Sequence, residues 1–345
     1  MKIRIFLGAG GVGKTSVTAA SALGTALVQG KHLVLTIDPA QRLRTALKLN
    51  AGMASAEKIP LDAYSPKGEL WAALLDIRAS LDRMVRHDTP AAQAENVLSN
   101  PIYELLTSSI GGMQELMAIE RIHQAMEDGF ESIFLDTAPS RHALEFLDKP
   151  EFFVDLVTSP MVQLVGRSYK WWKGSMLEKL SRKAFEVYTH VESLIGVQLT
   201  RDVLAFFAAF QKTAEKYAAR ARKTLDLLRN PEVTRFTIVS VPFQARKDAE
   251  YFCDEFARRR FYVDSMVVNR LWPPLPREMP GELPEAVRKS VEWYRAVSAA
   301  QLRKRDELVS AFSGRIPSII SVPDFPPDLQ GLEALHSMAQ SLRVL

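Results

Sequence analysis

Short apolar runs alternate along this chain with longer stretches in which apolar residues recur at helical spacing. Ile3–Leu7 is such a run, and a cluster of glycines ends it. Small and apolar residues then recur with a helical period over Lys14–Gln29, and Leu33–Ile37 forms the next run. Strand, glycine loop, helix and strand follow one another within about 38 residues. This order predicts a βαβ unit, and therefore a parallel sheet covered by helices.

Later apolar runs, rich in β-branched and aromatic residues, extend the pattern. We expect further parallel core strands at Ser132–Leu135, Phe236–Val241, Ser265–Val268 and Ile316–Val322. Glu69–Ile77 fits a strand or a helix equally well, because alanine and leucine are common in it. The sequence thus predicts an α/β fold built on a doubly wound, mostly parallel sheet.

A long middle segment has a different pattern. Strand signals are lacking between Leu147 and Pro231, where Val203–Leu228 predicts a strong helix, and Ala79–Met126 is also helical in character. We therefore expect one domain over residues 1–345, with a core of residues 1–78, 127–149 and 232–345 and a helical subdomain of about 79–126 and 150–231. Five prolines within Pro273–Pro284 predict a loop.

Composition and charge narrow the class of protein. Of 345 residues, 47% are apolar and 24% are charged, which is typical of a globular protein. The net charge of +4, without a basic arm or tail, does not indicate nucleic-acid binding. A single cysteine, Cys253, excludes an internal disulfide framework, and the histidines lack the HxxxH spacing of zinc sites. No apolar run approaches the ~18–20 residues of a membrane span, and Met1–Leu7 is too short for a signal peptide, so we expect a soluble, cytoplasmic protein.

The glycine cluster carries the strongest chemical signal. Gly8–Thr15 reads GAGGVGKT and fits the P-loop pattern GxxxxGK[ST]. Glycines let backbone N–H groups surround phosphate oxygens, Lys14 can reach the β- and γ-phosphates, and the Thr15 hydroxyl can coordinate Mg²⁺. The alternative is a chance glycine-rich turn, but this one lies between a predicted strand and a predicted helix. The candidate ATP-binding residues of this loop are Gly10, Gly11, Val12, Gly13, Lys14, Thr15 and Ser16.

Two carboxylates follow predicted strands. Asp136 ends the run Ile133–Leu135, where ligands bind in open α/β sheets, and it suits a role beside Mg²⁺. Asp38 follows Leu33–Ile37 and can orient a water that attacks the γ-phosphate, so Asp38 and Lys14 are the candidate catalytic residues. Either aspartate could instead cap the helix that follows it.

Several motifs together resemble the ArsA-type deviant P-loop ATPases, a family that contains arsenite-pump ATPases and the ATPase that targets tail-anchored membrane proteins. The matched blocks run in the family's order from the first strand to the last helix, and the helical insertion matches in position only. The matching segments are Gly8–Ser16, Thr36–Ala40, Gly112–Glu115, Leu135–His142, Val267–Arg270, Val322–Pro323 and Gln330–Glu333.

This resemblance implies roles for particular residues and two cofactors, ATP and Mg²⁺. Asp38 would position the hydrolytic water, and Asp136 would lie near Mg²⁺. Thr137–Pro139 would move on hydrolysis, Asn269 would contact adenine, and Pro323 would lie beside the base. Members of the family work as dimers that close around two ATP molecules, and closure reshapes the helical subdomains, which form a hydrophobic client groove in the targeting members.

Three departures from the family pattern affect this picture. Ala9 stands where the family usually has a lysine that reaches the partner's phosphates. Cys253 alone cannot supply the cysteine pair for zinc, or the three cysteines for metalloid, that other members use. Ser140–His142 replaces the usual Thr-Gly-His, so Arg141 adds a cation near the phosphates or points into solvent.

The function most consistent with the sequence is an ATPase whose nucleotide state drives dimer closure, as a homodimer or as a heterodimer with an ArsA-like paralogue. A regulatory subunit with weak intrinsic ATPase activity is the alternative that Ala9 favours, and a ParA- or MinD-like surface ATPase is the third. Within Gly166–Lys183, six basic residues surround Trp171 and Trp172. Such a segment packs on the core, binds a hydrophobic protein client or contacts a membrane surface peripherally.

Overall fold

The computed structural model divides into two compact units. The sheet unit comprises Met1–Leu74, Ala125–Ala143 and Leu227–Leu345, and the helical unit comprises Leu75–Gln124 and Leu144–Asp226. The structure describes residues 1–37, 43, 47, 56–109, 113–137, 147–150, 154–155, 197–276, 284–325 and 331–342. The helix expected after Asp38, apart from Leu43 and Leu47, and the Gly166–Lys183 segment lie outside these residues.

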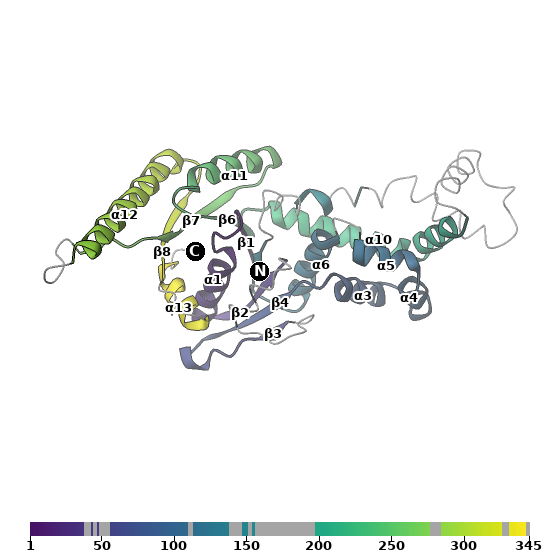
Figure 1. Ribbon diagram of the computed structural model, residues 1–345. Helices are drawn as coiled ribbons and strands as arrows, with labels where there is room; N and C mark the ends of the chain where they lie inside the picture. The colour runs from purple at the N-terminus through teal and green to yellow at the C-terminus, as the bar shows by residue number, and fades with distance from the viewer. Residues whose placement is uncertain are drawn as a thin grey trace, which may run out of the picture. The chain divides into compact units, whose positions relative to one another are not determined.

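The sheet unit is built on an eight-stranded sheet of order β3-β4-β2-β5-β1-β6-β7-β8 (Figure 1). Among the described strands, only the β3–β4 pair is antiparallel, which confirms the predicted mostly parallel α/β fold. Glu69–Ile77, which fitted strand or helix, supplies a strand as far as Leu74 and the start of a helix at Ile77. The strands are β1 (Lys2–Leu7), β2 (Gly30–Thr36), β3 (Glu57–Lys58), β4 (Gly68–Leu74), β5 (Ser132–Asp136), β6 (Thr234–Ser240), β7 (Val263–Leu271) and β8 (Ser318–Pro323).

Helices cover both faces of this sheet. On one face, α1 (Lys14–Val28) and α13 (Gly331–Ser341) pack over Phe6, Val34 and Phe134, which belong to three neighbouring strands. On the opposite face, the Phe256 ring of α11 (Ala245–Arg259) packs edge-on against Phe236 of β6. The described residues of this unit also form η1 (Asp62–Tyr64) and α12 (Glu285–Phe312). Burial of large apolar side chains on both faces explains why the strands read as continuous apolar runs.

The helical unit contains α3 (Ile77–Asp88), α4 (Ala91–Leu98), α5 (Pro101–Ser109) and most of α6 (Met113–Glu127) and α10 (Val197–Arg229). Helix α3 begins where the Asp76 carboxylate accepts a 2.9 Å hydrogen bond from the Ala79 N–H. The Arg220 guanidinium of α10 donates to Asp88 at 2.7 Å and to Glu120 at 3.0 Å. Because both carboxylates are buried, these ion pairs fix how the three helices meet. No helix in the described residues is long and apolar enough to cross a membrane.

Candidate nucleotide-binding site

The predicted site residues meet at the carboxyl edge of the sheet. Strand β1 lies between β5 and β6 in the sheet, and β2 lies on the other side of β5. Asp136 of β5 is the register partner of both Phe6 of β1 and Thr36 of β2. The loop after β1 leads into α1, whose first turn holds Lys14 and Thr15. This is the edge at which ligands bind in open α/β sheets.

Glycines of the loop occupy positions that a side chain could not. Gly8 has φ +150°, and a Cβ placed on it would lie 2.1 Å from the Val239 carbonyl oxygen. Gly13 has φ +91°, and a Cβ there would lie 2.3 Å from Nδ2 of Asn269. The backbone of the loop therefore approaches both β6 and β7 more closely than any residue with a Cβ allows.

Replacing Gly8 by alanine should lower the free energy of unfolding by about 3 kcal/mol, because the new Cβ collides with backbone as well as straining φ. Gly11→Ala is the matched control. Gly11 also has a positive φ, +78°, but a Cβ there would meet open space, so its cost should be about 1 kcal/mol. Urea denaturation of both variants measures the difference. Equal stabilities would show that the contact with β6 does not restrain the loop.

Lys14 is held inside the loop. Its side chain is buried, and Nζ donates hydrogen bonds of 2.9 Å to the carbonyl oxygens of Gly8 and Ala9. The ammonium group is thus positioned by the same backbone whose N–H groups would surround phosphate oxygens. This geometry suits binding of the β- and γ-phosphates.

A hydroxyl and a carboxylate stand together beside Lys14. The Thr15 hydroxyl donates a 2.7 Å hydrogen bond to Oδ2 of Asp136, and the Thr36 hydroxyl donates to the same oxygen at 3.1 Å. Asp136 is 1% exposed, and the next residue, Thr137, is tied to β1 by a 2.7 Å bond from its hydroxyl to the Phe6 carbonyl. Hydroxyl and carboxylate oxygens are the ligands that Mg²⁺ prefers. Thr15 and Asp136 therefore fit a magnesium site.

Asn269 lies on the other side of the loop. Its Nδ2 donates a 2.8 Å hydrogen bond to the Val12 carbonyl, which can only accept, so the orientation of the amide is determined. Oδ1 is buried and has no hydrogen-bond partner within the described residues. An adenine amino group would supply the missing donor. The residue thus fits contact with a nucleotide base.

The structure corrects the expected position of Asn269 relative to its strand. The apolar run ends at Val268, but β7 continues to Leu271, so Asn269 lies within the strand rather than after it. The register between β7 and β8 shifts between Val268 and Leu271, and Arg270 has φ +60°. Asn269 and Arg270 together lie opposite the single residue Val322 of β8, so they form a bulge in β7. Pro323, the other residue expected near the base, ends β8 opposite Leu271.

Other predicted residues stand as follows. Ser16 is half-buried in the first turn of α1, and Gly10 lies in the loop. Asp38 and Arg141 fall outside the described residues. Sequence reasoning assigned no role to Thr36. Its signal is a hydroxyl at the last position of a buried strand, two residues before Asp38.

Fold and site together define a P-loop nucleotide-binding protein. The family model described as Anion-transporting ATPase, ArsA, matches residues 1–344, so the chain belongs to this family of ATPases. It is 27% identical over 345 residues to ATPase get3 of Schizosaccharomyces pombe, covering 98% of this chain and 90% of that protein. It is also 31% identical over 152 residues to a putative arsenical pump-driving ATPase of Prosthecochloris vibrioformis, covering 44% of this chain and 36% of that protein.

Proposed function

We propose that this protein binds ATP with Mg²⁺ and hydrolyses it at the carboxyl edge of its sheet. The observation that carries the proposal is the 2.7 Å pair of Thr15 and Asp136 next to the buried Lys14. A cation for phosphates and an oxygen pair for a divalent metal occur side by side, as phosphoryl transfer requires. A purely structural role would not need all three groups in one place.

Each residue has a distinct task in this proposal. Lys14 would exchange its two carbonyl partners for phosphate oxygens. Thr15 and Asp136 would hold Mg²⁺, which bridges phosphate oxygens and neutralises their charge when it is bound. Asn269 would accept a hydrogen bond from adenine through Oδ1. Asp38 would orient the attacking water, a role that rests on its place after β2 in the sequence.

Changing Asp38 to asparagine tests the hydrolytic step. The substitution keeps the size of the side chain but removes the charge that orients the water. ATP turnover should fall by about 10²-fold or more, while the Kd for ATP stays the same. Asp128→Asn, in an exposed turn before β5, is the matched control and should turn over like the wild type. Turnover in the Asp38 variant equal to wild type, or turnover of the wild type that persists in EDTA, would contradict the proposed mechanism.

We further propose that nucleotide binding acts through a dimer in the cytoplasm, with the helical unit as the surface for a hydrophobic protein client. The support is the family relationship and a helical unit that the nucleotide site itself does not require. A second candidate is a regulatory subunit that hydrolyses ATP weakly alone. Ala9 favours it, because alanine cannot provide the cation that the family supplies across the dimer.

A further inference from the structure

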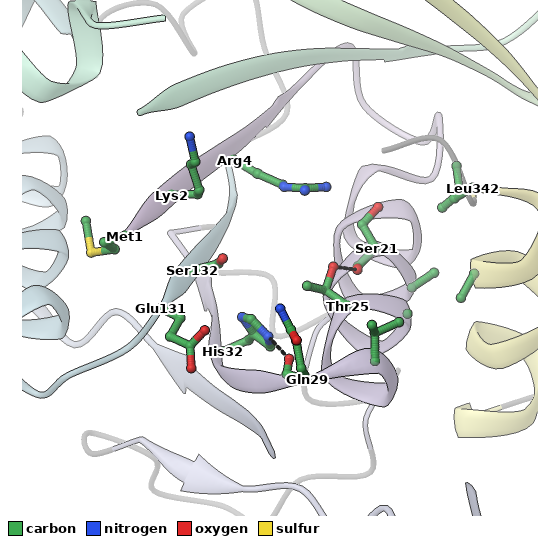
Figure 2. A pocket seen from close by; sticks show the side chains of 14 residues that line it. Met1, Lys2, Arg4, Ser21, Thr25, Gln29, His32, Glu131, Ser132 and Leu342 are labelled. Carbon is green, nitrogen blue, oxygen red and sulfur yellow. Dashed lines mark hydrogen bonds between the residues drawn. The ribbon is translucent and has the colours of Figure 1, made fainter. Parts of the chain in front are cut away.

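A second cavity lies at the opposite edge of the sheet from the P-loop. It has a volume of about 560 Å³ and is bounded by the first residues of β1, β2 and β5, the last turns of α1, and α13 (Figure 2). The sheet, α1 and the residues next to them contribute several polar side chains to its wall. They are Lys2, Arg4, Ser21, Thr25, Gln29, His32, Glu131 and Ser132.

One side of the cavity carries a half-buried cation, Arg4. Nε of Arg4 is buried, and the described residues offer it no hydrogen-bond acceptor. The guanidinium lies 5.4 Å from the centre of the Phe134 ring. Burial and the neighbouring Arg235 lower the pKa of Arg4 below its usual value, and Asp264 offsets this only in part. An anion bound here would supply the acceptor that Nε of Arg4 lacks.

The other side of the cavity presents hydrogen-bond acceptors. Nε2 of His32 lies 2.6 Å from the Gln29 carbonyl oxygen, which can only accept, so in the neutral ring the proton is on Nε2. Nδ1 then carries a lone pair, and this atom is buried without a partner among the residues that the structure describes. The Thr25 hydroxyl donates its proton to the Ser21 carbonyl at 2.9 Å, so its oxygen also faces this space as an acceptor.

We propose that this cavity is a binding site for a small organic anion that also carries hydroxyl groups. Its carboxylate or phosphate would pair with Arg4, and its hydroxyl groups would donate to Nδ1 of His32 and to Thr25. Hydroxycarboxylates and phosphate esters share this chemistry. The site is distinct from the nucleotide site, since α1 begins at the P-loop with Lys14 and reaches the cavity only in its last turns.

Thermal unfolding in the presence of L-malate or glycerol 3-phosphate tests the proposal. At least one of the two should raise the Tm saturably, and the responding probe identifies the anionic group. The rise should persist in saturating Mg·ADP. Arg4→Met, which keeps the length of the side chain, should weaken the apparent Kd about tenfold or more. The matched control is Arg235→Met, in the same row of the sheet but outside the cavity wall; it removes a neighbouring charge only and should weaken the apparent Kd much less than Arg4→Met does.

A second measurement does not depend on the folding of any variant. In wild-type protein labelled with ¹⁵N-histidine, the Nδ1 resonance of His32 should shift as the responding probe is added. No response to either probe, a response abolished by Mg·ADP, or an unmoved His32 resonance would overturn the proposal. So would equal loss of binding in the Arg4 and Arg235 variants, because that would indicate a general effect of surface charge.

Discussion

Alanine in place of Lys14 is expected to weaken ATP binding by on the order of 10²-fold or more. The ammonium group is already buried among the loop carbonyls of Gly8 and Ala9, and it would form charge-assisted hydrogen bonds to two phosphates. Each such bond is worth about 1.5–3 kcal/mol, and each 1.4 kcal/mol corresponds to a tenfold change in Kd. Isothermal titration calorimetry with Mg·ATP measures the loss directly.

Lys67→Ala is the control for this experiment, because Lys67 is an exposed lysine of the same unit in a loop before β4. Its affinity for ATP should equal that of the wild type. Circular dichroism establishes whether the Lys14 variant remains folded after it loses the two carbonyl contacts. A folded Lys14→Ala protein with wild-type affinity would mean that nucleotide does not bind at this loop.

The parallel sheet could be predicted because its central strands are buried on both faces. Ile133–Leu135 has no polar residue and Leu33–Ile37 has only Thr36, and both runs form strands in the structure. Strand β3 had no such signal. It is two residues long, lies at an edge and pairs antiparallel with β4. The residue pattern of Glu69–Ile77 could not distinguish a strand from a helix. The segment forms strand β4 because it pairs with β2, which is distant in sequence.

The sequence likewise predicted some residues of the candidate site and not others. The positions of Lys14, Thr15 and Asp136 at the carboxyl edge of the sheet could be predicted from the sequence. A P-loop motif and an aspartate at the end of a strand each have a defined place in the fold. The contact of Thr36 with Asp136 depends on β2 lying next to β5, an order that the sequence does not state. The requirement for glycine at position 8 depends likewise on the approach of the Val239 carbonyl from β6. Contacts between strands distant in sequence therefore mark the limit of sequence reasoning here.

The resemblance to the family implies a lysine at the position of Ala9, and the surroundings of Ala9 define what a substitution would do. The side chain is half-buried against the core cluster under α1, and its carbonyl oxygen accepts a hydrogen bond from Lys14. A lysine at this position can pack its aliphatic stem where the methyl group lies and extend its ammonium group outward. The backbone of the loop that we propose binds phosphate would be retained.

Ala9→Lys should therefore raise ATP turnover by about tenfold or more in a dimer with the family's geometry. Phosphoryl transfer depends on stabilising charge on the transferred group, and a cation supplied in trans contributes about 10³–10⁵ in rate. A symmetric homodimer of the wild type lacks that cation at both sites, so the wild type alone should turn over slowly. An ArsA-like partner chain with the lysine would restore it at one site of a heterodimer.

Steady-state ATPase assays of the purified chain decide between these arrangements. Ala9→Met is the matched control, because it adds similar length without charge and should leave the slow rate unchanged. A rise in the lysine variant alone assigns the effect to the cation. Fast turnover by the wild type that is unaffected by Arg141→Ala would refute both the partner chain and rescue by Arg141, since neither cation would then limit the rate.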